Sequence, residues 1–310
     1  MKIAIIGPGA MGLLFGGYLS QKHDVTLIGR NSQVMERIVQ QGILIRETDG
    51  VEKRYYPHAV TDSSDLHDID LVIMFVKAGI SAEALETHKG LIGKDTFLMT
   101  LQNGMGHDRL LRQYAQEDHV IIGTTRQGSY RLDETSVCHS GKGETAIGMI
   151  VTEADIFQSN KSLNAVRDVF EESGFPCVIA DKVRGMIWDK LMINASSSVL
   201  SGILQTAQGY VAENESAWQI AQKLIEEICE VATADGYPFD SGEQIARIKA
   251  HLQNAPGGYT SIYADLKSGR TTEVSVINGA VVEAGHRLGV AVPTHEMVTA
   301  LVHAMEQRGL

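Results

Sequence analysis

The chain has 310 residues, 44% of them hydrophobic, and a formal net charge of −11 at pH 7. This length allows a large buried core and favours two domains, while the acidic balance argues against a nucleic-acid or membrane-surface partner. The three cysteines, Cys138, Cys177 and Cys229, are odd in number and widely spaced, which predicts buried, reduced thiols and no metal site. No apolar run reaches membrane-spanning length and no signal peptide is evident, so we expect a soluble cytoplasmic protein.

The first twelve residues predict a dinucleotide-binding unit. An apolar strand, Ile3 to Ile6, runs into Gly7-Pro8-Gly9-Ala10-Met11-Gly12, and an apolar helix follows. In this context the first glycine allows a tight turn, the second lets the backbone approach a pyrophosphate, and the third lets the helix pack closely on the strand. The phosphates would meet N–H groups of the loop, Ala10 and Met11 included, at the positive end of the helix. The alternative is a glycine-rich turn without a ligand.

The second strand indicates which dinucleotide is bound. Asp24 to Ile28 is followed by Gly29 and Arg30, at the point where a Rossmann unit faces the adenosine ribose. No acid stands there to bind the 2′-hydroxyl of NAD, whereas Arg30 can accommodate the 2′-phosphate of NADP. We therefore predict NADP, with a solvated surface arginine as the alternative. Ser32 can cap the next helix, 33–41, or touch the phosphate.

Further apolar runs complete the amino-terminal half. They predict a hairpin inserted in the sheet at 43–45 and 54–56, a helix at 161–172, and strands at 70–76, 97–101, 120–124, 135–140, 145–150 and 175–179. This alternation predicts a mostly parallel, doubly wound sheet with helices on both faces. Lys77 and Asn103 follow two of the strands at their carboxyl ends, where ligands of such sheets bind. Either could instead be a plain strand terminus, because Asn-Gly is a common turn.

Helical periodicity replaces the strand patterns after Asp181. It predicts helices at 183–204, 215–235, 241–253, 272–288 and 294–307. We therefore expect an α/β chain with a Rossmann-type domain at 1–181, an all-α domain at 182–310, and a cleft between them.

Two polar constellations interrupt this helical half. Lys190, Asn194 and Ser198 share one face of an apolar helix, which indicates either the wall of a polar site or an amphipathic helix with its lysine in water. Further on, Ser261 precedes a helical turn, and Thr271 or Thr272 can cap the next helix. Glu273 then falls in its first turn. An acid there complements the helix dipole, and the pattern alone favours that structural role.

The motifs occur together in an order that resembles the ketopantoate reductase family, NADPH-dependent enzymes that make pantoate for pantothenate synthesis. They are the glycine fingerprint, an arginine after the second strand, V-K, Q-N-G, W-x-K-L-x-x-N, and S-x-x-x-D followed after seven residues by E-x-x-x-I-N-G. The resemblance covers nearly the full chain, and its last two motifs are specific to that family. It implies a Rossmann domain followed by a helical domain, with the active site in the cleft.

The resemblance also implies roles for individual residues. Lys190 falls on the catalytic lysine, with Asn194 and Glu273 completing the catalytic group. Asn194 and Ser261 fall on substrate-binding positions, and Ser198, in the place of the family's second asparagine, is also predicted to bind the substrate. The implied cofactor positions are Gly7, Gly9, Ala10, Met11, Gly12, Arg30, Lys77, Asn103 and Glu273.

One departure bears on the substrate. Where the family usually has a second asparagine, this chain has Ser198, whose single hydroxyl reaches less far than an amide. Relatives of similar architecture are D-2-hydroxyacid dehydrogenases that reduce branched or aromatic 2-keto acids, usually with NAD, and Arg30 argues against that branch. A dinucleotide sensor without turnover would need neither Lys190 nor Glu273. A 3-hydroxyacid or polyol dehydrogenase is disfavoured by the E-x-x-x-I-N-G motif. The expected partners are a small 2-keto acid and, at most, a second copy of the chain as a homodimer.

Overall fold

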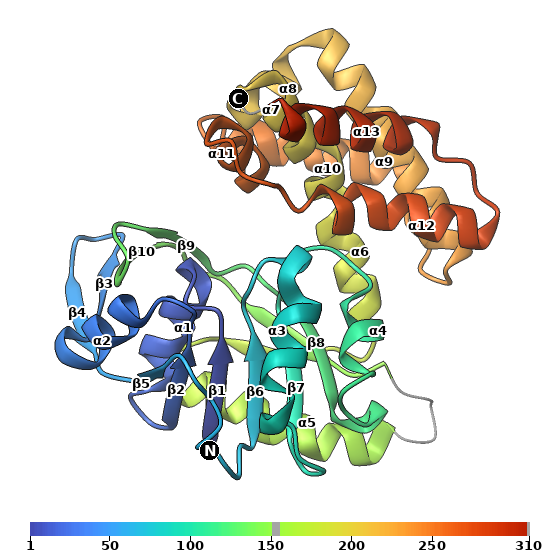
Figure 1. Cartoon of the computed structure of the whole chain (residues 1–310). Coiled ribbons are helices and arrows are strands. Elements are labelled where there is room, and N and C mark those ends of the chain that lie inside the picture. The colour runs from blue at the N-terminus through green and yellow to red at the C-terminus, as the bar shows by residue number, and fades with distance from the viewer. Residues whose placement is uncertain (151–155, 309–310) are drawn as a thin grey trace. The chain divides into compact units, whose positions relative to one another are not determined.

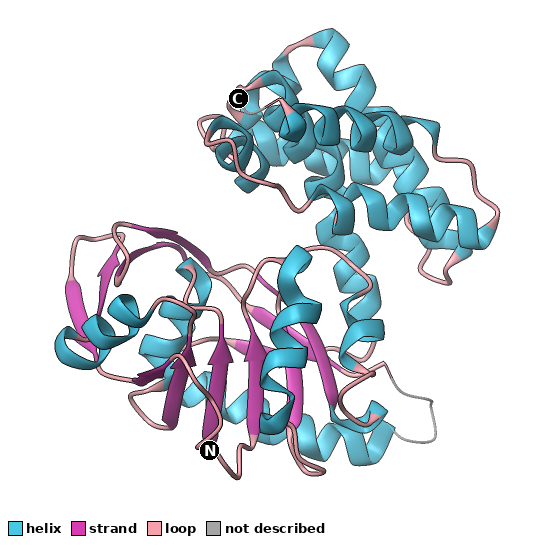
Figure 2. Ribbon diagram, viewed as in Figure 1, coloured by secondary structure: helices cyan, strands magenta, loops and turns pink. Residues whose placement is uncertain are grey.

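The computed structural model describes residues 1–150 and 156–308, which form two compact units. One unit holds Met1–Gln102 and His107–Val183, and the other holds Asn103–Gly106 and the chain from Arg184 onward. Strands lie in the first unit, and the second is built of helices (Figure 2). The expected α/β fold class, a Rossmann-type domain followed by an all-α domain, is confirmed. The limits 1–181 and 182–310 stay a prediction, and the short segment 103–106 that clusters with the helices was not part of it.

A mostly parallel sheet forms the centre of the first unit (Figure 1). In spatial order its strands are β12 (Cys177–Ile179), β11 (Thr145–Gly148), β8 (Val120–Thr125), β7 (Phe97–Thr100), β6 (Leu71–Met74), β1 (Lys2–Ile6), β2 (Asp24–Ile28) and β5 (His58–Val60). Every neighbouring pair is parallel except β8 with β11. Strands β1, β6, β7 and β8 at the centre of this sheet are almost wholly buried, as a parallel sheet covered on both faces requires.

A second, four-stranded sheet lies beside the first. Its order is β4 (Glu52–Tyr55), β3 (Ile43–Glu47), β10 (Ser136–Gly141) and β9 (Gly128–Arg131). The prediction that the 43–56 hairpin is inserted in the main sheet was therefore wrong, because this hairpin pairs with β10 instead. The reason is visible in β4, which exposes all residues but Tyr55 and so could not lie in a sheet buried on both faces.

Helices cover the main sheet. They are α1 (Ala10–Leu19), α2 (Ser32–Gln41), α3 (Ser81–His88), α4 (His107–Leu111) and α5 (Ile156–Glu172). Helix α3 passes in front of the sheet and α5 behind it in the view of Figure 1. Helix α1 is apolar on every side because it packs against both β1–β2 of the main sheet and β3, β9 and β10 of the second. Its Phe15 ring stacks on Phe175 at a centroid distance of 4.3 Å and meets Phe170 edge-on at 5.5 Å.

The cap of α2 differs from the expectation. Asn31, not Ser32, precedes the first helical turn, and its side-chain oxygen accepts a hydrogen bond from the N–H of Val34 at 3.2 Å. Ser32 is the first residue of the helix and is exposed. Its hydroxyl is therefore not used as the cap.

The helical unit contains the following elements: α6 (Val183–Ile193), the π-helical turn η5 (Asn194–Ser198), α7 (Val199–Leu204), α8 (Gln208–Glu213), α9 (Glu215–Ala234), α10 (Ser241–Asn254), α11 (Ser261–Lys267), the 3₁₀ turn η6 (Val274–Val276), α12 (Asn278–Leu288) and α13 (Pro293–Gln307). Two expectations need correction here. The helix expected over 183–204 contains a π-turn, and the helix expected from residue 272 begins at Asn278. Among the described residues, no helix has the length and apolar character needed to cross a membrane. The three cysteines are buried and unpaired, as expected, and burial raises the pKa of Cys229 to about 11.

Candidate functional site

The glycine loop has the shape that a dinucleotide requires. Gly7 adopts φ +105°, and a Cβ there would lie 2.6 Å from the backbone nitrogen of Val76. A Cβ on Gly12 would lie 2.0 Å from the carbonyl oxygen of Gly7. These two glycines are therefore required by the chain's own packing. Gly9 is different, because its backbone suits any residue and a Cβ would meet no atom closer than 3.8 Å. Glycine at this position is thus not required by the chain's own packing, and it suits the close approach of a pyrophosphate to the backbone.

The loop lies at the point where the strand order reverses. β1 is flanked by β2 on one side and by β6 on the other, and doubly wound sheets bind ligands outside the carboxyl ends of strands at this point. The turn is held by hydrogen bonds from Gly7 N to Ile28 O at 3.0 Å and from Phe75 N to Ile6 O at 2.8 Å. Helix α1 has no side-chain cap, so the N–H groups of Ala10 and Met11 in its first turn are available to an anion.

Two cations follow the strands on either side of β1. Arg30 is the second residue after β2, and Lys77 is the third after β6. Both side chains are exposed, and both strands end at the same edge of the sheet as the glycine loop. These positions suit the phosphates of NADP, and the two contacts stay predictions.

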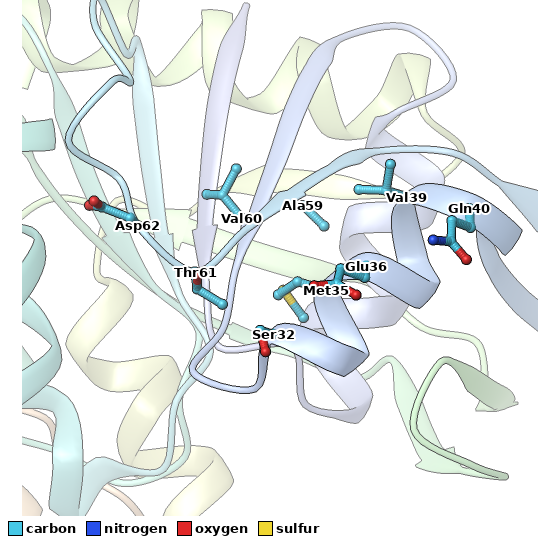
Figure 3. A pocket seen from close by; sticks show the side chains of 9 residues that line it. All are labelled: Ser32, Met35, Glu36, Val39, Gln40, Ala59, Val60, Thr61 and Asp62. Carbon is cyan, nitrogen blue, oxygen red and sulfur yellow. The ribbon is translucent and has the colours of Figure 1, made fainter.

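A pocket of about 400 Å³ lies between α2 and β5 (Figure 3). It is lined by Ser32, Met35, Glu36, Val39, Gln40, Ala59, Val60, Thr61 and Asp62. Ser32 is the one member that the sequence patterns had singled out. The pocket includes no residue of the glycine loop and neither Arg30 nor Lys77, and Ser32 is the one residue that it shares with the predicted phosphate contacts.

Asn103 and Glu273, which are 170 residues apart in sequence, meet in the helical unit. The amide nitrogen of Asn103 donates to the Glu273 carboxylate at 3.3 Å. The next residues fasten this contact, because Met105 N donates to Val276 O at 2.9 Å and a Cβ on Gly104 would lie 2.2 Å from the same oxygen. The pair therefore joins two predicted site residues whose motifs are far apart.

The structural role favoured for Glu273 was wrong. Glu273 precedes the 3₁₀ turn η6 and stands five residues before α12, so it does not complement a helix dipole from the first turn. The hydroxyl of Thr272 accepts from Val274 N at 3.1 Å and supports the 3₁₀ turn rather than an α-helix. Glu273 is half-buried and accepts a hydrogen bond from Asn103, and its role in the site stays a prediction.

The W-x-K-L-x-x-N motif ends at Asn194, the first residue of the π-turn η5. Lys190 lies in the last turn of α6 and is half-buried, while Asn194 and Ser198 are the first and last residues of η5. Ser196 and Ser197 donate their hydroxyls back to the carbonyl groups of Met192 and Ile193. Such bonds compete with the helix ladder, and π-turns occur frequently at functional sites. The regular i, i+4, i+8 face expected from Lys190 to Ser198 is thus interrupted after Asn194.

A buried polar chain supports the π-turn. Asn278 is fully buried, and its amide nitrogen lies 2.7 Å from the carbonyl oxygen of Ala195 and 3.1 Å from Nδ1 of His295. His295 Nε2 in turn donates to the carbonyl oxygen of Leu224 at 3.1 Å. Burial lowers the pKa of His295 to about 4, so the imidazole is neutral at pH 7 and Nδ1 accepts from Asn278. Asn278 belongs to the I-N-G motif, but sequence reasoning assigned it no role.

Ser198 is contacted from two further segments. Gln208 donates its side-chain amide to the Ser198 hydroxyl at 3.2 Å, and Thr260 donates its hydroxyl to the Ser198 carbonyl at 3.3 Å. Thr260 also caps α11, whose first residue is the exposed Ser261. The structure thereby brings the predicted substrate residues Ser198 and Ser261 onto neighbouring segments. Sequence reasoning missed Gln208 and Thr260, because neither stands in a motif and α8 was not predicted.

A doubly wound dinucleotide unit, joined to a helical unit in which Lys190 lies in the last turn of α6 and Asn194 begins the π-turn that follows, defines a nicotinamide-dependent oxidoreductase. The chain belongs to the ketopantoate reductase family. The family's sequence model "Ketopantoate reductase PanE/ApbA" matches residues 3–151, and "Ketopantoate reductase PanE/ApbA C terminal" matches residues 182–306.

Individual relatives match the chain along its whole length. The 2-dehydropantoate 2-reductase of Pyrococcus horikoshii is 29% identical over 310 residues, covering 100% of this chain and 99% of that protein. The enzyme of the same name from Halobacterium salinarum is 28% identical, with full coverage of both. Among solved structures, D-mandelate dehydrogenase with NADH and anilino(oxo)acetate has a TM-score of 0.90 and 28% identity, covering 100% of this chain and 99% of that one. A PanE/ApbA family ketopantoate reductase from Ralstonia eutropha has a TM-score of 0.87 at 28% identity, with the same coverage.

Proposed function

We propose that the protein is a 2-dehydropantoate 2-reductase, which reduces ketopantoate to pantoate with NADPH in pantothenate biosynthesis. The observation that carries this proposal is the match of both halves of the chain to the family, joined to a glycine loop in which the chain's own packing does not require Gly9 to be glycine. NADPH, when bound, supplies the hydride that reduces the 2-keto carbon.

In this proposal Lys190 and Asn194 interact with the keto oxygen of the substrate. The developing alkoxide needs a proton and positive charge, and the Lys190 ammonium can supply both. Asn194, four residues further on at the start of the π-turn, holds the same oxygen or the lysine through its amide. The Asn278–Ala195 hydrogen bond at 2.7 Å keeps the turn that presents Asn194 in place.

Ser261 and Glu273 form hydrogen bonds with the two ends of the substrate. The exposed hydroxyl of Ser261 can donate to the substrate carboxylate without burying another charge. Glu273 accepts a hydrogen bond from the terminal hydroxyl of ketopantoate, and Asn103 orients its carboxylate from the other side. An acceptor placed for that hydroxyl is left unpaired by an analogue that lacks it, which discriminates better than apolar fit does.

The test compares kcat/KM for ketopantoate and for 2-ketoisovalerate, which lacks the hydroxymethyl group. We expect a clear preference for ketopantoate, and Glu273→Ala should remove most of that preference and much of the rate. Glu296→Ala is the matched control, because Glu296 is an exposed acid of the same unit whose recorded partner is His286. A wild-type preference for 2-ketoisovalerate would contradict the proposed substrate.

A second candidate function is supported by the resemblance to D-mandelate dehydrogenase at a TM-score of 0.90. That structure holds NADH, and Ser198 in place of an amide leaves slightly more room for a bulky keto acid. A D-2-hydroxyacid dehydrogenase would favour phenylpyruvate or 2-ketoisocaproate over ketopantoate. Assaying these acids with NADPH and with NADH separates the two functions.

The cytoplasm is the proposed location, supported by three buried, unpaired cysteines in an acidic chain. We also propose that any self-association of the chain is a homodimer, and light scattering of the purified protein tests it.

A further inference from the structure

The carbonyl groups of the glycine loop are held from outside the fingerprint. Arg131 donates a guanidinium N–H to the carbonyl oxygen of Pro8, and Ser129 donates its hydroxyl to the carbonyl oxygen of Ala10 at 3.2 Å. Both residues lie on β9 of the second sheet, about 120 residues further along the chain. Neither belongs to a motif that predicts cofactor binding.

The contact with Pro8 determines where the next N–H group points. No peptide bond in the described residues is cis, and in a trans peptide the C=O and N–H groups point in opposite directions. With the Pro8 carbonyl turned toward Arg131, the N–H of Gly9 is turned away from it. Within residues 1–150 and 156–308, no acceptor is recorded for this N–H. It belongs to the residue of the fingerprint at which a pyrophosphate approaches the backbone.

The loop depends on this donor more than a glycine loop usually does. Pro8 has no N–H to offer, and the N–H of Gly7 is already bonded to Ile28 O at 3.0 Å. The N–H of Gly9 is therefore the first available donor of the loop. A hydrogen bond to a carbonyl polarises its amide and strengthens the bond that the N–H makes on the other side.

The position of Arg131 is set by the second sheet. In the β9–β10 pairing Ser129 lies opposite His139, whose Nε2 is 2.8 Å from the side-chain oxygen of Gln127. Nδ1 of His139 lies 3.2 Å from the Glu47 carboxylate, which also accepts the hydroxyl of Tyr18 from α1. This partly buried chain of hydrogen bonds connects the second sheet to the helix that begins at the glycine loop.

We propose that Arg131 is a positioning residue for the cofactor, which orients and polarises the Gly9 N–H toward the pyrophosphate by holding the Pro8 carbonyl. The inference rests on the proposed function only in its assignment of the loop to a dinucleotide, and it is independent of which keto acid is reduced. In this proposal Arg30 binds the 2′-phosphate, and Arg131 supports binding of the pyrophosphate.

The affinities of the protein for two cofactor fragments test these two roles separately. ADP-ribose contains the pyrophosphate without a 2′-phosphate, and adenosine 2′-monophosphate contains the 2′-phosphate without a pyrophosphate. By calorimetry, Arg131→Ala should lower the affinity for ADP-ribose about three- to tenfold, which corresponds to the loss of one hydrogen bond. The affinity for adenosine 2′-monophosphate should change by no more than about twofold. Arg30→Ala should show the opposite pattern. Arg131→Lys, which keeps a cationic donor, should recover most of the ADP-ribose affinity.

Arg46→Ala is the matched control, since Arg46 is an exposed arginine of the same sheet paired with Glu52, and it should change neither affinity. In the unliganded protein, the amide resonance of Gly9 should shift in Arg131→Ala by more than that of Gly7. Equal weakening of both fragments, or an ADP-ribose affinity that does not change, would overturn the proposal. If ADP-ribose binds as expected but ketopantoate is not reduced, the substrate assignment fails and the role of Arg131 stands.

Discussion

Replacing Asn278 by alanine should destabilise the helical unit and impair the substrate site together. Asn278 is fully buried, and the substitution removes its hydrogen bonds to the Ala195 carbonyl at 2.7 Å and to His295 Nδ1 at 3.1 Å. Each buried group left without a partner costs about 1–3 kcal/mol. The side-chain oxygen of Asn278 has no partner among the described residues, so its removal recovers part of that cost. We expect a net loss of about 1–4 kcal/mol in the free energy of unfolding.

Tryptophan fluorescence in a urea titration measures this loss. The chain has two tryptophans, and both Trp188 and Trp218 are buried in the helical unit, so the signal reports on that unit. Because the Ala195 carbonyl belongs to the turn that begins at Asn194, KM for the keto acid should also rise and kcat should fall.

Asn214→Ala is the matched control. Asn214 caps α9, with its side-chain oxygen accepting from Ala217 N at 3.0 Å, so its loss should cost about 1 kcal/mol without changing KM or kcat. If Asn278→Ala destabilises no more than this control and leaves the kinetics unchanged, the Asn278 hydrogen bonds do not support the turn and the reasoning fails.

Three further predictions follow from the site. Arg30→Ala should weaken NADPH binding by about 1.5–3 kcal/mol and leave NADH nearly unchanged in a fluorescence titration, and equal affinity of the wild type for both cofactors would contradict it. Lys190→Ala should lower kcat by roughly two to four orders of magnitude while NADPH still binds. Near-normal turnover would show that Lys190 is an ordinary surface lysine of an amphipathic helix. His295 has a pKa lowered from 6.5 to about 4 by burial, so the unfolded chain binds its proton first and stability should be lost as the pH falls from about 6.5 toward 4. His295→Asn should flatten this part of the stability profile, and an unchanged slope would show that other groups cause it.

Much of the cofactor half could be predicted from local sequence. A strand of apolar residues entering a glycine loop is a short-range pattern, because the turn at Gly7 and the close packing at Gly12 depend on residues within one βα unit. The bounds of β2, Asp24–Ile28, agree with the prediction for the same reason. In the helical half, the family motifs predict site roles for Lys190 and Glu273, and these roles stay predictions, although the pattern alone favoured a structural role for Glu273.

The tertiary structure decided the contacts that depend on long-range pairing. The 43–56 hairpin joined a second sheet because its partner, β10, lies some 80 residues further along the chain, and no local signal selects between two sheets. The meetings of Asn103 with Glu273, of Asn278 with Ala195, and of Arg131 with Pro8 join residues at sequence separations of 170, 83 and 123. Residue type and spacing determine which side chains can donate or accept within one element. Which of them meet is decided only when separate elements pack, because buried polar groups must find partners wherever the fold places them.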